Sequence, residues 1–370
     1  AADRAYSYGI TWGDFDGDGW PDLFVPVMVN GTHLLYRNLG GGRFARVTSG
    51  SIAADREANF GTWVDYNNDG HLDLYVVHGL VPGKTNALHR NHGDGTFTAM
   101  PGDVVGPIVT DVGMYASSSW GDYDNDGYLD VIVTNNDRNP GGGPNFFYHN
   151  NSDGSFTRVL SGSPANDAGA ASTFCTWADY DEDGFLDLFV ARSVFVQFTN
   201  LLYRNNGNSN HWIKVKLTGT VSNRSAIGAK VRVKATIRGK TFWQLREISS
   251  GPAFSQTPLT AHFGLGDATR IETLRIEWPS GTVQEFHDLA AKQVLTITEP
   301  PRLQALGRLA DGSFQLSLTG GLGMSYNVES STNLARWTQW TSLTITNRTT
   351  TITDSTTATA PQRFYRAVSR

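Results

Sequence analysis

Short runs in which apolar and polar residues alternate recur along the chain, and Gly, Asn and Asp lie between them. Stretches such as DLFVPVMV from Asp22 and LDLYVVH from Leu72 are rich in β-branched and aromatic residues. This pattern is typical of β-strands bounded by turns, and no stretch of useful length keeps the 3.6-residue period of an amphipathic helix. The sequence therefore predicts an all-β protein.

The first 210 residues contain a fourfold repeat. Four segments align without gaps: WGDFDGDGWPDLFV from Trp12, WVDYNNDGHLDLYV from Trp63, WGDYDNDGYLDVIV from Trp120 and WADYDEDGFLDLFV from Trp177. A second block follows each of them in phase, around Asn38, Asn91, Asn150 and Asn205. The first aspartates of the four segments are 51, 57 and 57 residues apart, which is the size of a four-stranded propeller blade. One blade cannot bury its own faces, so the blades must stack, with the four phased tryptophans in the core.

Each segment carries an acidic loop of the pattern D-x-[DN]-x-D-G-x-x-D. Oxygen ligands at alternate positions of a tight loop converge on one point, and such a set suits Ca²⁺ better than Mg²⁺. The predicted ligands, with the carbonyl donor in fourth place, are Asp14, Asp16, Asp18, Trp20 and Asp22; Asp65, Asn67, Asp69, His71 and Asp73; Asp122, Asp124, Asp126, Tyr128 and Asp130; and Asp179, Asp181, Asp183, Phe185 and Asp187. An EF-hand needs Glu at position 12, where these loops have Val25, Val76, Val133 and Val190. We therefore expect about four structural calcium ions.

These loops and their phased blocks resemble the FG-GAP/VCBS repeats of integrin-type β-propellers over about residues 1–210. The resemblance implies that the calcium loops are scaffold elements and that none is catalytic. Propellers of this family usually have about seven blades, whereas four are legible here. Further blades, a small ring, or an arc completed by the next domain would each account for the difference.

Two further β segments follow the repeats. In residues 211–299, phrases such as HWIKVKLTG and GAKVRVKATIRGK alternate with period two, as half-buried antiparallel strands do. The stretches SNRSAIGAKV, SSGPAFSQ and AHFGLGDAT resemble the ASPIC/UnbV domain, which follows FG-GAP repeats in cartilage-acidic-protein-like chains and implies no activity of its own. Glu299-Pro300-Pro301 is predicted to be a linker, and residues 302–370 a small fibronectin- or immunoglobulin-like sandwich. The predicted fold is thus a propeller followed by antiparallel sandwich-like domains.

Composition narrows the class of protein. The formal net charge of −5 argues against a nucleic-acid partner, and no apolar run is long enough to span a membrane. Cys175 is the only cysteine, so no intrachain disulfide forms, and its apolar surroundings predict a buried, inert thiol. A secreted or cell-surface protein without disulfides needs another source of stability, and a bound metal ion can provide it.

The motifs favour an interaction or adhesion protein that binds a protein or a glycan. Each strong motif has a structural explanation, and no set of residues with catalytic spacing remains unexplained. The alternative is a calcium-dependent carbohydrate-active lyase or dehydratase, in which His71 or His78 beside the second loop would pair with a tyrosine to abstract a proton. A pocket lined by His, Tyr and Arg near a metal would distinguish the two. The sequence assigns no catalytic residue and leaves the oligomeric state open.

Overall fold

The computed structural model describes residues 5–7, 9–29, 31–79, 83–137, 143–167, 171–192, 199–249, 251, 258–356 and 362–369. They form two compact units. The first consists of residues 1–215, 228–276 and 284–295, and the second of residues 216–227, 277–283 and 296–370. Among the described residues, no helix has the length and apolar character needed to cross a membrane.

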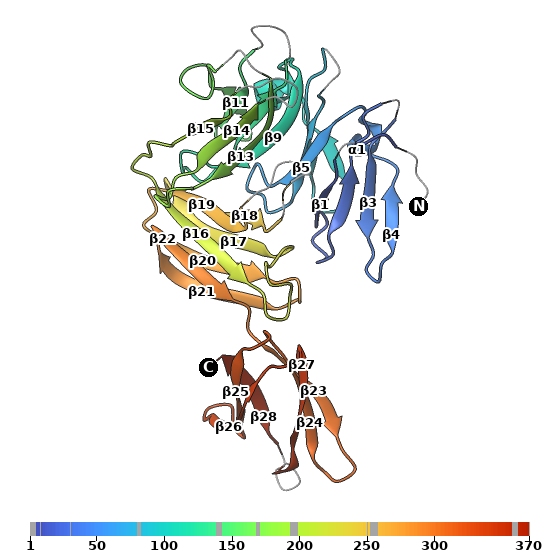
Figure 1. Cartoon of the computed structure of the whole chain (residues 1–370), viewed down its shortest axis with the longest axis vertical. Helices are drawn as coiled ribbons and strands as arrows, with labels where there is room; N and C mark the ends of the chain where they lie inside the picture. The colour runs from blue at the N-terminus through green and yellow to red at the C-terminus, as the bar shows by residue number, and fades with distance from the viewer. Residues whose placement is uncertain are drawn as a thin grey trace. The chain divides into compact units, whose positions relative to one another are not determined.

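Each of the four repeats folds into one antiparallel sheet whose strands follow chain order (Figure 1). Blade 1 contains β1 (Thr11–Gly13), β2 (Asp22–Val25), β3 (Leu34–Asn38) and β4 (Phe44–Val47), and blade 2 contains β5 (Phe60–Val64), β6 (Asp73–Val77), β7 (Ala87–Asn91) and β8 (Phe97–Ala99). Blade 3 contains β9 (Tyr115–Gly121), β10 (Asp130–Asn135), β11 (Phe146–Asn150) and β12 (Phe156–Arg158), and blade 4 contains β13 (Ser172–Ala178), β14 (Asp187–Arg192) and β15 (Leu201–Tyr203). The predicted all-β, propeller-type fold is confirmed.

The helices are short and lie between blades. They are α1 (Ser51–Ala54) before blade 2, and α2 (Gly102–Val105) with the 3₁₀ turn η1 (Gly106–Val109) before blade 3. Every acidic loop joins the first strand of its blade to the second. All four loops are therefore presented at the same end of their blades.

The hydrophobic core lies between consecutive blades. One cluster joins blades 1 and 2, a second joins blades 2 and 3, and a third joins blades 3 and 4. Trp63 illustrates the contact, because its ring stacks on Phe15 of blade 1 at 5.7 Å and lies where Gly13 has no side chain. The predicted core position holds for Trp177, which is 5% exposed, but not for Trp12, which is 45% exposed and has no described blade against it.

The phased asparagines provide a second link between blades. Their side-chain amides donate to a backbone carbonyl of the preceding blade: Asn91 to Phe15 at 2.7 Å, Asn150 to Tyr66 at 2.9 Å and Asn205 to Tyr123 at 2.7 Å. Each amide also donates to the carbonyl two residues after the loop glycine of its own blade. In blades 2, 3 and 4 one amide thus joins two blades and the end of an acidic loop, whereas Asn38 of blade 1 donates to Pro21 of its own blade.

The second β segment, residues 211–299, forms two antiparallel sheets. One contains β19 (Thr260–Gly266), β16 (His211–Thr218) and β22 (Gln293–Thr298), and the other β18 (Lys240–Glu247), β17 (Lys230–Ile237), β20 (Arg270–Glu277) and β21 (Val283–Ala290). The third segment also has two sheets: β23 (Arg302–Arg308), β24 (Phe314–Thr319) and β27 (Thr349–Asp354), then β26 (Thr338–Thr344), β25 (Ser325–Ser331) and β28 (Phe364–Ser369). The fibronectin or immunoglobulin character of this last segment remains a prediction.

Glu299, at the start of the predicted linker, is fully buried. Its Oε2 accepts the backbone N–H groups of Thr220, Val221 and Ser222 at 2.9, 2.8 and 2.7 Å, and its Oε1 accepts the hydroxyls of Ser222 and Ser280. A buried carboxylate is stable only when it is hydrogen-bonded in this way. Glu299 therefore anchors the chain within the second unit instead of lying in a free linker.

The interblade asparagines can be tested with an isosteric change. Asn150→Asp places a carboxylate oxygen against the carbonyls of Tyr66 and Leu129 in a buried position, which should cost about 2–4 kcal/mol of unfolding free energy in urea. Asn38→Asp is the matched control, because Asn38 donates to one carbonyl, that of Pro21 in its own blade. We expect a clearly smaller loss for the control, and equal losses would contradict an interblade role for Asn150.

Candidate metal centre

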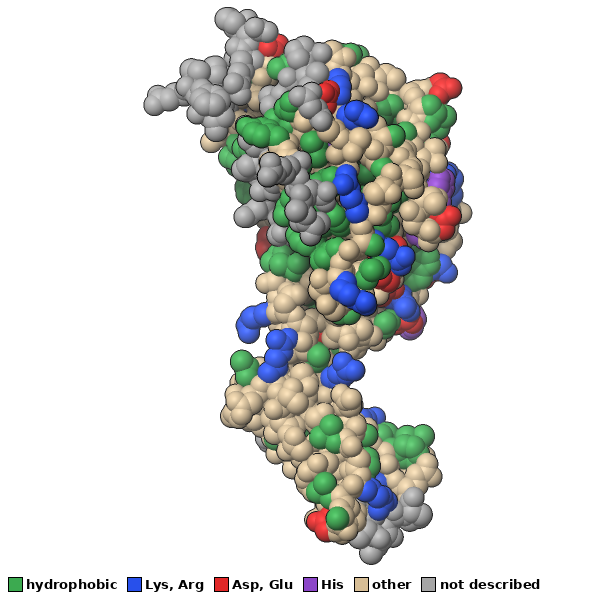
Figure 2. Space-filling view, turned by 90° about the vertical axis from the view of Figure 1, so that its right-hand side faces the viewer, with side chains coloured by type: hydrophobic (Ala, Val, Ile, Leu, Met, Phe, Trp, Pro, Cys, Tyr) green, Lys and Arg blue, Asp and Glu red, His purple; other side chains and the backbone are tan. Residues whose placement is uncertain are grey.

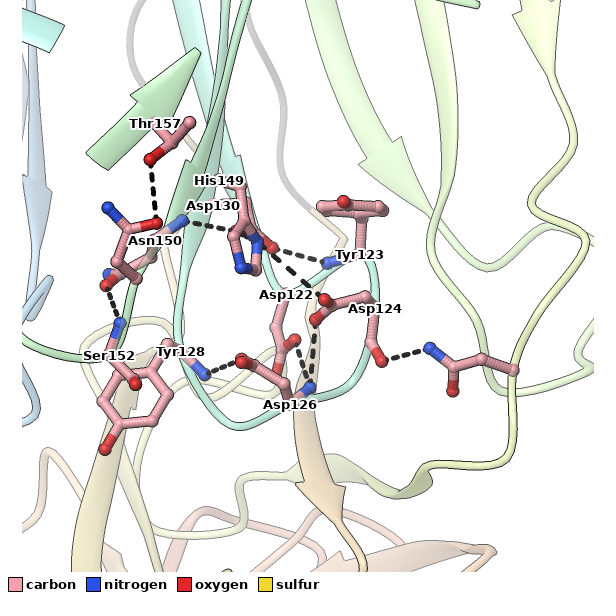
Figure 3. Close-up of polar contacts among 12 residues, drawn as sticks. Asp122, Tyr123, Asp124, Asp126, Tyr128, Asp130, His149, Asn150, Ser152 and Thr157 are labelled. Atoms are coloured by element: carbon pink, nitrogen blue, oxygen red, sulfur yellow. Dashed lines mark hydrogen bonds and ion pairs between the residues drawn. The ribbon is translucent and has the colours of Figure 1, made fainter. Parts of the chain in front are cut away.

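The carboxylates of the first, second and third acidic loops converge. In the third loop, Asp122, Asp124 and Asp126 point toward one another (Figure 3), and one oxygen of each lies within 4.8 Å of the others. The same holds for Asp14, Asp16 and Asp18 in the first loop, and for Asp65, Asp69 and Asp73 in the second. Like charges held this close repel one another strongly unless a cation or protons neutralise them.

The first aspartate of each loop closes a tight turn. Its Oδ2 accepts the N–H of the loop glycine, at 2.8 Å for Asp14 and Gly19 and 2.9 Å for Asp179 and Gly184. Each of these glycines has φ between 89 and 98°, a conformation that favours residues without a Cβ. The other oxygens, Oδ1 of Asp14 and of Asp179, are buried and have no hydrogen-bond partner among the described residues. Such oxygens are suited to bind a cation.

The last aspartate of each loop is almost completely buried and holds the blade together. In the third loop, Oδ2 of Asp130 accepts the N–H of Tyr123 at 3.2 Å and Oδ1 accepts the N–H of Asn150 at 2.9 Å. The corresponding bonds occur at Asp22, Asp73 and Asp187. The structure thus brings these predicted ligands to the loop but also gives them backbone partners. Their role as metal ligands remains a prediction.

The four predicted carbonyl donors also lie in the loops. The backbone N–H groups of Trp20, His71, Tyr128 and Phe185 donate to the aspartate two residues earlier. Their side chains pack elsewhere: the His71 ring lies against Gly93 and the Tyr128 ring is 5.1 Å from Phe242. Asn67 accepts the N–H of Asp69 at 3.0 Å. Coordination by these carbonyls is not tested by the structure.

Burial makes the loops costly to ionise on their own. Burial raises the pKa of Asp22, Asp65 and Asp130 to about 7 and that of Asp73 to about 9. Neighbouring loop carboxylates add to each shift. Both oxygens of Asp73 nevertheless accept backbone N–H groups, an arrangement that suits the ionised form. A hard cation bound in the loop would resolve this conflict, so the donor set fits Ca²⁺.

A phased basic residue lies beside each loop. Arg37 pairs with Asp16, Arg90 with Asp69 at 3.1 Å, and Arg204 with Asp181 at 2.7 Å. His149 takes this place in the third loop, 3.0 Å from Asp130 (Figure 3), and this hydrogen bond raises the pKa of His149 to about 9. The basic partners immediately precede the interblade asparagines in sequence, so the repeat itself contained this signal.

Further cations come from the second β segment, and the sequence analysis missed them. Lys230 Nζ lies 2.7 Å from Asp14, and Lys214 Nζ lies 2.5 Å from Asp179. The buried Arg246 acts on both Asp65 and Asp122 through its charge. One signal was available: Lys214 stands between Ile213 and Val215, both 0% exposed, so a cation interrupts an apolar run. Even so, fifteen loop aspartates outnumber the basic groups that face them among the described residues.

A second phased set of aspartates was also missed. Asp55, Asp111 and Asp167 are 56 residues apart, and each lies in the connection before a blade. They accept hydrogen bonds from the same position of the third strand: His89 Nε2 at 3.1 Å, the Tyr148 hydroxyl at 3.0 Å, and the Tyr203 hydroxyl. His89 is therefore a packed strand residue, as its repeat position predicts.

Asp55 differs from its equivalents because three histidines surround it. His78 Nε2 is 2.9 Å and His33 Nε2 is 3.7 Å from its carboxylate, in addition to His89. Burial alone would raise the pKa of Asp55, but the hydrogen bonds from His78 and His89 lower it well below its usual range. The cluster thus holds a buried carboxylate in its ionised form.

The repeat defines the tautomer of His33, which a structure without hydrogens does not show directly. In blades 2, 3 and 4 the equivalent residue is Asn86, Asn145 or Asn200, and its Oδ1 accepts a backbone N–H. In blade 1, Nδ1 of His33 accepts the N–H of Val27 at 3.0 Å. Since Nδ1 is the acceptor, Nε2 carries the proton and cannot ligate a metal. In this tautomer His33 does not ligate a metal through Nε2, which faces Asp55 at 3.7 Å without a hydrogen-bond partner among the described residues.

A pH test follows from this assignment. Burial lowers the pKa of His33 to about 4, against about 6.5 in the unfolded chain. The unfolded state binds the extra proton first, so stability is lost as the pH falls from about 6.5 to about 4, by up to about 3 kcal/mol. His33→Asn restores the residue type of the other blades and keeps the acceptor.

We expect the His33→Asn variant to match the wild type near pH 7 and to lose less unfolding free energy by pH 4.5. Lys84 and Asp55, whose charges also act on His33, are unchanged in both proteins. Parallel losses in urea titrations at the two pH values would show that His33 is not buried in its neutral form.

The remaining residues considered as functional candidates from the sequence do not form a catalytic site at the cavity described here. Cys175 is buried, as predicted, and burial raises the pKa of its thiol to about 12. A cavity of about 360 Å³ lies between blades 2 and 3, beside the second acidic loop. Its lining includes Tyr66, Asn67, Asp69, Arg90, Met100, Val104, Tyr128 and Asp153. Neither His71 nor His78 is among the described residues that line it, so the geometry proposed for a lyase is not found at this cavity.

Comparison with known proteins agrees with the arrangement of the repeats. Residues 14–76, 79–133 and 122–190 match the FG-GAP-like repeat, and residues 219–304 match the family ASPIC and UnbV. The chain carries FG-GAP-like repeats and an ASPIC/UnbV domain. The two modules follow one another in the predicted order.

Among curated proteins, the chain is similar to cartilage acidic protein 1. It is 27% identical to the Mus musculus protein over 315 residues, covering 79% of this chain and 44% of that protein. It is 27% identical to the Homo sapiens protein over 297 residues, covering 74% of this chain and 41% of that protein. The chain therefore spans less than half the length of the curated relatives it matches.

Solved structures give weaker similarities. An Agrocybe aegerita lectin described as recognising non-reducing terminal N-acetylglucosamine aligns with 15% identity and a TM-score of 0.34, covering 94% of this chain and 71% of that one. A structure described as a glycoside hydrolase aligns with 9% identity and a TM-score of 0.29, covering 98% and 94%. At these scores neither structure bears on the activity of this chain.

Proposed function

We propose that the protein is a secreted or cell-surface interaction protein, that calcium stabilises its blades, and that it binds a glycan or protein partner. The observation that carries the proposal is the convergence of carboxylates in the first three acidic loops, which lie at the same end of consecutive blades. Every phased motif has a structural task, which favours a scaffold over a catalyst. The FG-GAP-like repeats and the similarity to cartilage acidic protein 1 support the same class.

About four Ca²⁺ ions would be held by the loop carboxylates. The unpaired Oδ1 atoms of Asp14 and Asp179 would bind the ions of the first and fourth loops, together with the neighbouring aspartates. The cation would supply charge neutralisation and would link the two strands that each loop joins. Sites of extracellular modules have dissociation constants of about 10⁻⁴ to 10⁻³ M, a strength suited to permanent occupancy outside the cell.

Removal of metal tests the calcium proposal. A ligand that binds only the native state stabilises it by about 2.7 kcal/mol when its concentration is a hundred times the dissociation constant. We therefore expect the melting temperature of the full chain to rise by several degrees from EDTA to millimolar calcium, and to rise less with the same concentration of magnesium. Identical melting curves in EDTA and calcium would refute a structural role for the ion.

The cavity between blades 2 and 3 is the proposed binding site for a glycan. Its lining combines the aromatic ring of the half-buried Tyr128 with planar polar groups of Asn67, Asp69 and Arg90. Rings of this kind stack on the apolar faces of sugars, and carboxylate, amide and guanidinium groups pair with adjacent hydroxyls. On the face drawn in Figure 2, acidic, basic and apolar side chains lie among one another. The cavity lining itself includes Asp69, Asp153 and Arg90, and a neutral glycan suits this mixture of charges better than a polyanion.

A blocking variant tests the site. Val104 lines the cavity from α2 and is 52% exposed, so Val104→Arg should fill the site without disturbing the core. Val112→Arg is the matched control, because Val112 is 57% exposed and lies outside the lining. On a glycan array we expect binding by the wild type and the control and at least a tenfold loss for Val104→Arg. Equal binding by all three proteins would place the site elsewhere.

A further inference from the structure

The fourth position of every acidic loop has a left-handed backbone. It is occupied by Gly17 in the first loop, Asn68 in the second, Asn125 in the third and Glu182 in the fourth, with φ between 58 and 74°. Glycine and asparagine adopt this conformation more readily than most residues. The position lies between the second and third predicted ligands of its loop and is not itself a predicted ligand.

Two of these side chains reach the next acidic loop. The Asn68 amide donates to the carbonyl of Gly127 at 3.0 Å, and the Asn125 amide donates to the carbonyl of Gly184 at 3.1 Å. Each acceptor is the loop glycine of the following repeat, and Asn125 is completely buried. A buried amide needs a partner of this kind. The second, third and fourth loops are therefore joined in series by side-chain hydrogen bonds.

The first loop is not part of this series. Gly17 has no side chain to donate, and the carbonyl of Gly70 in the second loop instead accepts a hydrogen bond from the Arg232 guanidinium of β17 at 3.2 Å. In the fourth loop, the carbonyl of Gly184 accepts His262 Nε2 of β19 at 3.0 Å in addition to the amide of the third loop. The loop-to-loop bonds thus connect three of the four acidic loops.

Each accepting carbonyl belongs to a peptide group whose N–H holds a predicted calcium ligand. The peptide group of the Gly127 carbonyl ends in the N–H of Tyr128, which donates to Asp126 Oδ1 at 3.0 Å (Figure 3). In the fourth loop, the corresponding N–H of Phe185 donates to Asp183 Oδ1 at 2.9 Å. Hydrogen bonds at the two ends of one peptide group polarise each other. A continuous chain of bonds therefore runs from one loop to a predicted ligand of the next.

We propose that the second, third and fourth loops bind calcium with positive cooperativity, and that the hydrogen bonds of Asn68 and Asn125 carry the coupling. This inference rests on the calcium sites of the proposed function and adds the way in which those sites act on one another. The coupling is reciprocal, so an ion in any one of the three loops favours ions in the other two. The first loop binds its ion independently.

The direction of the coupling follows from the charge of a metal-free loop. Without a cation the carboxylates of the third loop repel one another, and a loop that opens withdraws the Gly127 carbonyl from Asn68. An ion that closes the third loop returns this acceptor, so the second loop is partly ordered before its own ion binds. A ligand that binds an already ordered site loses less conformational entropy. Repulsion between neighbouring ions acts in the opposite direction, so the sign of the cooperativity is a direct test.

Calcium titration of the metal-free full chain by isothermal titration calorimetry measures the coupling. A double variant, Asn68→Gly with Asn125→Gly, removes both amides and introduces the residue that the first loop has at this position. Glycine also tolerates the left-handed backbone. Glu182→Gly is the matched control, because it makes the same backbone change at φ 59° in the last acidic loop of the sequence, which has no later loop to bond.

We expect a larger Hill coefficient for the wild type and the control than for the double variant, whose coefficient should be one or below. Each lost bond should also weaken calcium binding at the loops that it joins by about fivefold. Each single Asn→Gly variant should have an intermediate coefficient. Sites of unequal intrinsic strength lower the coefficients of all the proteins, so the difference between them is the measure. Melting curves in saturating calcium close to that of the wild type show that the variants are folded.

The same titration separates the coupling from the calcium sites themselves. A wild type that binds no calcium refutes the sites and the coupling together. A wild type and a double variant that bind equal numbers of ions with equal Hill coefficients leave the sites in place and overturn the coupling. A control that loses cooperativity as fully as the double variant also overturns it, because backbone flexibility and not the amide bonds would then be responsible.

Discussion

The contact between consecutive blades is the interaction on which the first unit of this protein depends. A blade of three or four short strands has two apolar faces and no interior of its own, so its side chains are buried only against a neighbour. The three clusters follow this rule, since each takes residues from two blades. Burial of each large side chain contributes about 1.5–3 kcal/mol, and the interblade asparagines add directional bonds that set the register. The sequence patterns that predict individual strands therefore give a buried core only when the blades stack.

The acidic loops impose a second constraint at one end of the stack. Their carboxylates serve the backbone, because they accept the N–H groups of the loop glycine and of the third strand. As hydrogen-bond acceptors the carboxylates order the turn, but they also bring several negative charges together where the loop is partly buried. The phased Arg and His side chains offset part of it. A divalent cation is the component best able to offset the remainder, because several oxygens already point to one position.

The sequence predicted much of what repeats or alternates, although the phased Asp55, Asp111 and Asp167 and the phased basic residues beside the loops were missed. The four loops, the strands around them and the two modules were legible because the same residue types return at fixed spacing. Three features were not. The exposure of Trp12 depends on the absence of a covering blade, which its own phase cannot reveal. Lys214 and Lys230 meet loop aspartates 35 and 216 residues away in sequence; Lys214 interrupts an apolar run, but no local pattern identifies the partner of either lysine. Glu299 looked like the start of a linker because the prolines that follow it are turn signals, whereas its partners lie 77 to 79 residues earlier.

The second β segment has a closer relation to the blades than an appended module would have. Buried lysines of β16 and β17 reach the first and fourth loops, Arg246 of β18 acts on the second and third, and Arg232 and His262 donate to the carbonyls of loop glycines 70 and 184. A buried cation is stable only beside an anion, so these residues depend on the acidic loops as much as the loops depend on them. The charges of the blades and of the ASPIC/UnbV sheets therefore stabilise one another. This mutual dependence gives a physical reason for the two modules to occur together in one chain.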